Sequence, residues 1–115
     1  MLILLMVLFF VMGVGAIFFP QKVLGQFGIE QLSIDAKSEV RAVYGGFGLA
    51  MALALTWSAW APSLSDGIFF TIALALAGMA IGRVASMIID FKLGLLPFIY
   101  FVVEAVFSAA LFICY

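Results

Sequence analysis

The sequence contains no histidine, one cysteine and few charged residues. Without histidine, the chain lacks the most common metal ligand and the usual general base near neutral pH. The single Cys114 excludes an internal disulfide and a Cys-x-x-Cys redox pair. Only 10% of residues are charged and the formal net charge is −1, so the basic stripe expected of a nucleic-acid-binding protein is missing. We therefore expect no metal site and no nucleic-acid partner.

Apolar residues are abundant instead. They make up 68% of the 115 residues, and the mean hydropathy is +1.37, which is typical of a membrane protein. A helix needs about 20 apolar residues to cross a bilayer, and four stretches approach or reach that length: residues 2–19, 42–61, 68–91 and 95–115. These observations predict an all-α integral membrane protein, a four-transmembrane-helix bundle that forms a single domain over residues 1–115.

The first loop contains a short amphipathic segment at residues 21–27. A helix there places Val23, Leu24 and Phe27 on one face beside Lys22, which is typical of a short interfacial helix. A connector tethered between two spanning helices is the alternative.

Capping residues predict the other helix boundaries. Asp35 is expected to cap the second spanning helix, and Pro62 to end it. Gly94 and Pro97 are expected to separate the third helix from the fourth.

The positive charges predict the orientation in the membrane. Lys22, Lys37, Arg41 and Lys92 all fall on one side of the predicted spans, and the other side carries no Lys or Arg. The positive-inside rule places that side in the cytoplasm, so both termini are expected to be extracytoplasmic.

Small residues recur at four-residue intervals, which lets helix backbones approach closely in a bilayer. We interpret them as helix-packing positions inside the bundle, with an oligomer interface as the alternative. The predicted packing positions are Gly46, Ala50 and Ala54 in the second helix and Gly78 and Gly82 in the third.

Two opposite charges, Arg83 and Glu104, lie within long apolar segments on either side of a short turn. Arg83 lies nine residues before Lys92, and Glu104 lies seven after Pro97. At about 1.5 Å per residue, both are roughly 10 to 14 Å inside their helices. Because a charge in hydrocarbon is costly unless it is paired, this depth predicts an intramembrane salt bridge.

Other polar residues share helix faces with this pair, and the three faces are expected to converge in the inner half of the bilayer. Arg41 and Asp90 are expected to form a second ion pair. The charges either fix helix register or line the floor of a ligand pocket. The predicted polar cluster comprises Arg41, Tyr44, Arg83, Ser86, Asp90, Tyr100 and Glu104.

The runs at residues 39–46 and 82–86, with Asp90 and Glu104, resemble a bacterial membrane family, the domain of unknown function DUF4345. The resemblance covers nearly the whole chain. It implies a four-helix inner-membrane protein distantly akin to the DoxX and DoxD group, some members of which are small subunits of quinone-linked oxidoreductases. It implies no established activity. The family's shared charged positions map onto Arg41, Arg83, Asp90 and Glu104.

Two functions from different classes fit these residues. The first is an accessory or structural subunit that packs in a larger membrane complex or a homo-oligomer, because no catalytic constellation is present. The second is a binder or carrier of a small lipophilic or anionic ligand, quinone-like or lipid-like, at the polar cluster. An enzyme acting alone fits less well, and no cofactor is expected beyond a bound quinone or lipid.

Overall fold

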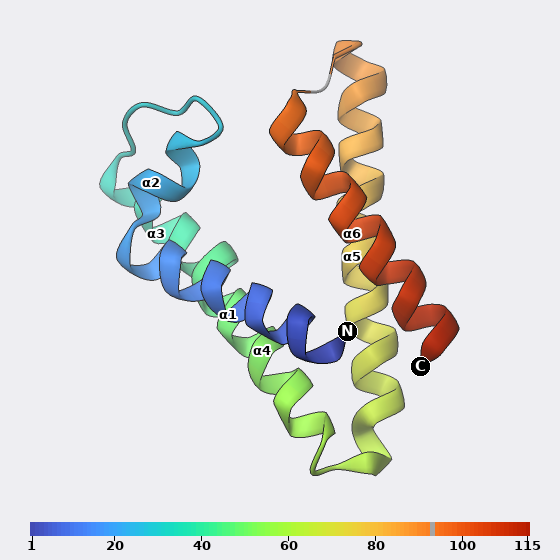
Figure 1. The fold of residues 1–115 in the computed structure, drawn as a ribbon. Helices are drawn as coiled ribbons and strands as arrows, with labels where there is room; N and C mark the ends of the chain where they lie inside the picture. Colours follow the sequence, from blue (N-terminus) through green and yellow to red (C-terminus); the bar gives the residue numbers. More distant parts are fainter. Residues whose placement is uncertain (93) are drawn as a thin grey trace. The chain divides into compact units, whose positions relative to one another are not determined.

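The computed structural model describes residues 1–92 and 94–115, and these residues form helices and connecting loops with no strand. Figure 1 traces the helices in chain order. The chain divides into two compact units, Met1–Trp60 (unit 1) and Ala61–Tyr115 (unit 2). The predicted all-α class is confirmed, and the single four-helix domain stays a prediction.

Unit 1 contains one long helix made of three consecutive segments. These are α3 (Ile34–Val40), a π-helical segment η1 (Arg41–Gly46) and α4 (Phe47–Ser58), which together form a continuous helix of 25 residues. It begins where the Ser33 side chain accepts a hydrogen bond from the Ala36 amide at 3.1 Å. The predicted cap at Asp35 was therefore wrong by two residues, and the residues before the apolar stretch at 42–61 belong to the same helix. Asp35 lies in the first turn, where a negative charge favours the helix dipole.

The other long helix of unit 1 is α1 (Leu2–Phe18), which packs antiparallel against η1 and α4 (Figure 1). Its buried residues recur every three or four positions and so form one face of the helix. They are Leu5, Phe9, Gly13 and Ala16.

A short helix, α2 (Pro20–Gly25), follows α1 and is held by its own loop. The Gln21 side chain donates to the Glu30 carbonyl at 2.8 Å and accepts from the Leu32 amide at 2.7 Å. Val23 and Leu24 pack against a small core formed by Ala16, Leu32 and Val40. Because its own chain covers these two side chains, insertion of α2 into the membrane interface stays a prediction.

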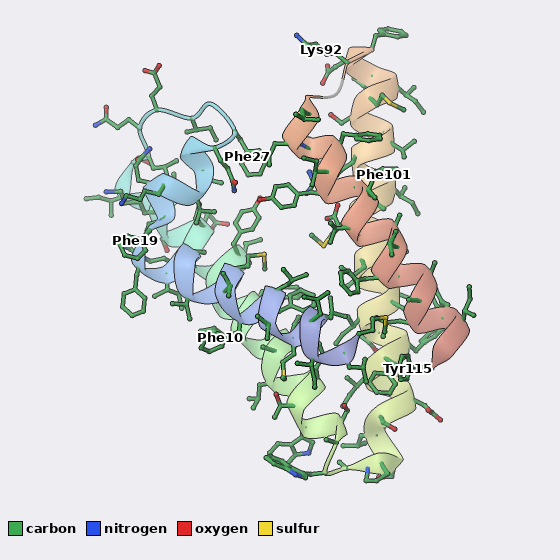
Figure 2. All side chains as sticks on the ribbon, viewed as in Figure 1. Phe10, Phe19, Phe27, Lys92, Phe101 and Tyr115 are labelled. Atoms are coloured by element: carbon green, nitrogen blue, oxygen red, sulfur yellow. The ribbon has the colours of Figure 1, made fainter. Side chains whose placement is uncertain are left out.

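Unit 2 is a hairpin of α5 (Pro62–Asp90) and α6 (Leu95–Cys114). Pro62 occupies the first turn of α5, where its missing N–H is not needed, so it begins this helix. Phe91, with φ of 53°, ends α5 in the left-handed conformation. Near the other end of the hairpin, the Tyr115 ring lies 5.1 Å from that of Phe69 (Figure 2).

Three helices are long and apolar enough to cross a membrane: Ile34–Ser58, Pro62–Asp90 and Leu95–Ile113. Less than a third of each hydrophobic window is buried inside the protein. Exposed apolar surface of this extent suits a lipid surrounding rather than water. These three helices support a membrane protein. The helix α1 is apolar but has only 17 residues, so the count of four spans stays a prediction.

Candidate functional site

The predicted ion pair between Arg83 and Glu104 is present in unit 2. Arg83 Nε donates to Glu104 Oε1 at 2.5 Å, and Nη2 donates to Oε2 at 3.4 Å. The Glu104 side chain is 6% exposed and that of Arg83 is 25% exposed. Both carboxylate oxygens therefore accept from the same guanidinium, a two-point contact that fixes orientation as well as distance.

Tyr100 contacts the same guanidinium from α6. The centre of the Tyr100 ring lies 5.4 Å from the guanidinium carbon of Arg83, a cation–π distance. Tyr100 and Glu104 are four residues apart, so they lie on one face of α6. Arg83 is thus held by an aromatic ring and by a carboxylate on successive turns of the partner helix.

A second polar contact joins α5 to α6 further along the hairpin. Ser108 Oγ donates to the Ala73 carbonyl oxygen at 2.8 Å, and both residues are buried. Sequence reasoning missed this contact because its acceptor is a backbone atom. Among the described residues, every buried side-chain nitrogen or oxygen has a hydrogen-bond partner. Together with the ion pair, this contact fixes the register of α5 against α6.

The remaining predicted polar residues of unit 2 lie near the C-terminal end of α5. Ser86 is half-buried, and Asp90 is exposed at the last position of the helix.

Arg41 and Tyr44 lie in the π-helical segment of unit 1. Arg41 Nε donates to the Ile17 carbonyl oxygen at 2.9 Å, and the Arg41 side chain is exposed. Carbonyls in the last turn of a helix lack intrahelical partners, and a cation there is favoured by the helix dipole. Arg41 therefore caps the C-terminal end of α1. Its pairing with Asp90, which belongs to the other unit, stays a prediction, as does convergence of the polar faces.

Most of the predicted packing residues are exposed within their own units. Gly46 and Ala50 are exposed and Ala54 is half-buried. A Cβ atom on Gly78 or Gly82 would have no neighbour within 4 Å. Packing of these small residues against another surface stays a prediction.

A different set of glycines brings the helices of unit 1 together. A Cβ on Gly13 would lie 2.8 Å from the Gly45 carbonyl oxygen and 2.9 Å from the Leu49 amide nitrogen. A Cβ on Gly48 would lie 2.9 Å from the Phe9 carbonyl oxygen. Sequence reasoning missed this role, although glycines in two neighbouring apolar segments were its signal.

Within residues 1–92 and 94–115, no group of three or more His, Cys, Asp or Glu residues could hold a metal ion.

One family model matches this sequence. It is described as a domain of unknown function (DUF4345), and the match spans residues 1–115. No curated protein and no solved structure matched the chain.

Proposed function

The chain belongs to the family of the domain of unknown function DUF4345 over residues 1–115, and we propose that it is an accessory or structural subunit of a membrane assembly. It packs in a larger membrane complex or against copies of itself, and it carries out no reaction of its own. The observation that carries this proposal is the closed Arg83–Glu104 pair.

An ion pair that closes on itself favours a structural role over catalysis. Both Glu104 oxygens accept from Arg83, and Tyr100 contacts the guanidinium. A catalytic or ligand-binding group needs a free donor or acceptor within reach of its substrate. The partners of Glu104 therefore support register-setting as its task.

The proposal includes four membrane spans in the inner membrane of a bacterium. The helix α1 spans about 25 Å at 1.5 Å per residue, and 17 residues is the lower limit for a transmembrane helix. The cations Lys22, Lys37 and Lys92 support a cytoplasmic first loop and a cytoplasmic turn between α5 and α6. Distant kinship to DoxX and DoxD proteins belongs to the same proposal.

Reporter fusions test this topology. A reporter fused after Tyr115 is expected to be active outside the cytoplasm, and one inserted within residues 21–37 to be active inside it. A third fusion, at Trp60 between α4 and α5, provides the control and is expected to match Tyr115. The opposite pattern would move the loop with Lys22 and Lys37 to the outside and contradict the proposed orientation.

The open face of α5 tests the assembly role. Replacing Gly78 by Leu fills a position with no neighbour within 4 Å and favours the helix by about 1 kcal/mol, so the isolated chain should remain folded. If a partner helix packs on this face, Gly78→Leu is expected to lose that partner in native mass spectrometry of the mildly extracted complex. The control is Met87→Phe, two and a half turns further along the helix and so on its opposite side, at a position that is 44% exposed and already bulky.

Two results would contradict the packing of a partner helix against Gly78. A Gly78→Leu chain that retains every partner would show that no helix packs against Gly78. A Gly78→Leu chain that is less stable when purified alone would assign the position to packing within the chain.

The alternative function is binding of a lipid-like or quinone-like ligand at the polar cluster. One observation favours it: Arg41 is exposed and uses one guanidinium nitrogen on Ile17, which leaves its charge accessible.

A further inference from the structure

An open apolar groove lies between α1 and α4 in unit 1. Its volume is about 440 Å³, within the range of ligand pockets. Phe10, one of its lining residues, is 54% exposed and is labelled in Figure 2. The groove is lined by Met6, Val7, Phe10, Leu49, Ala52, Leu53 and Thr56.

The only polar side chain of this groove is already engaged. Thr56 Oγ1 lies 2.9 Å from the Ala52 carbonyl oxygen and 2.7 Å from the Met6 sulfur, both of which are acceptors. Its one hydrogen is thus directed at the chain itself. A polar occupant would lose hydrogen bonds on entering, whereas a hydrocarbon chain would lose none. The groove therefore favours hydrocarbon.

The faces of α1 and of the long helix that line the groove also carry Ile17 and Arg41. On α1, Phe10 and Ile17 are seven residues apart, a spacing that returns to the same face. On the long helix, Arg41, Gly45 and Leu49 follow at four-residue intervals, close to one turn each. The hydrogen bond from Arg41 Nε to the Ile17 carbonyl joins the two faces at their end, at 2.9 Å. The guanidinium thus stands at the end of the face that carries the groove.

The guanidinium of Arg41 suits a phosphate. Its Nε is held by Ile17, and its side chain is exposed, so the charge of the guanidinium stays accessible. A guanidinium matches phosphate oxygens in a two-point contact better than an ammonium does. The nearest acid in sequence, Glu39, lies two residues away, where helix side chains do not face each other.

The depth of the groove fits a lipid whose headgroup lies at Arg41. Leu49 and Thr56 follow Arg41 by 8 and 15 residues, or about 12 and 22 Å along the helix. The headgroup region and hydrocarbon of one leaflet together measure about 20 Å. The acyl chain of a lipid whose phosphate binds Arg41 would therefore pass along the groove before it reaches the bilayer midplane.

We propose that unit 1 binds one anionic phospholipid, with its phosphate on Arg41 and an acyl chain in the groove between α1 and α4. This site rests on the membrane placement proposed above, and it requires no protein partner.

Native mass spectrometry with defined lipids tests the site. Purified protein is titrated with phosphatidylglycerol and, separately, with phosphatidylcholine carrying the same acyl chains. Wild type is expected to bind one phosphatidylglycerol about tenfold more tightly, because both lipids carry a phosphate but the choline cation of phosphatidylcholine lies close to its phosphate and repels the guanidinium of Arg41. Arg41→Gln should remove this preference. Leu53→Trp, which fills the groove at a 62% exposed position, should weaken both lipids, and Lys92→Gln in unit 2 should change neither.

Several results would overturn the proposal. Equal binding of the two lipids by wild type would contradict a site for an anionic headgroup. If circular dichroism shows that Arg41→Gln does not fold, the folded Leu53→Trp variant tests the site instead. Unchanged lipid binding by Leu53→Trp would show that no acyl chain lies in the groove. If the wild type forms a dimer without bound lipid and Leu53→Trp is monomeric, a second copy of the chain, rather than a lipid, fills the groove. Loss of protein partners is recorded separately on mildly extracted complexes, so failure of the accessory role remains distinguishable.

Discussion

Replacing Arg83 alone or Glu104 alone by an apolar residue is expected to destabilise the protein more than replacing both together. Removing one partner of a buried ion pair leaves the other charge without compensation, at a cost of about 3 to 5 kcal/mol. Glu104 is 6% exposed and Arg83 25%, so Arg83→Met, which strands the more buried charge, should be the more damaging single change. The double variant removes both charges and should recover much of the loss.

The measurement is the free energy of unfolding in mild detergent, obtained by titration with a denaturing detergent for the wild type, Arg83→Met, Glu104→Leu and the double variant. Asp90→Asn serves as the control, because it removes an exposed charge from the same helix and should change stability by about 0.5 kcal/mol or less. Losses that simply add in the double variant would show that the two side chains are not coupled.

This pair shows what the sequence can predict. The apolar stretch at residues 95–115 corresponds closely to α6, and the one at 68–91 to α5 except that α5 begins six residues earlier, at Pro62. The short turn between the two helices places Arg83 opposite Glu104. Counting residues from that turn was sufficient because an α-helix rises by a constant amount per residue. Side-chain charges also leave an unmistakable signal in an apolar segment.

Contacts to backbone atoms left no such signal. Arg41 binds the Ile17 carbonyl and Ser108 binds the Ala73 carbonyl. Every residue carries a carbonyl, so a sequence cannot say which one a side chain will reach. The pairing of Arg41 with Asp90 was expected because their helix faces were predicted to converge in the inner half of the bilayer, and it stays a prediction.

The N-cap of the second span was predicted two residues too late, at Asp35 instead of Ser33. The helix begins at Ile34 because Ser33 caps it, and its first two turns contain Asp35, Lys37 and Glu39. Serine and aspartate are both favoured N-cap residues, so the sequence alone does not choose between Ser33 and Asp35. The π-helical segment at residues 41–46 was likewise not predicted, because its wider turn has no side-chain pattern of its own.

Gly13→Ala is expected to destabilise the protein, although alanine is the better helix former by about 1 kcal/mol. The added methyl group would lie 2.8 Å from the Gly45 carbonyl oxygen and 2.9 Å from the Leu49 amide nitrogen. Both are backbone atoms, so α1 must move away from the long helix. Overpacking of this kind costs about 1 to 3 kcal/mol, and the same separation would stretch the bond between Arg41 and Ile17.

Gly15→Ala is the matched control for Gly13→Ala, because it lies two residues away on the same helix. Its new methyl group would meet only a Val23 methyl at 3.8 Å, an ordinary contact. Gly15→Ala is therefore expected to stabilise the protein by up to about 1 kcal/mol, so the two variants should change the free energy of unfolding in opposite directions. Adding Leu49→Ala should not rescue Gly13→Ala, since the backbone contacts remain. Stabilisation by both alanine variants would show that α1 does not pack closely against the long helix.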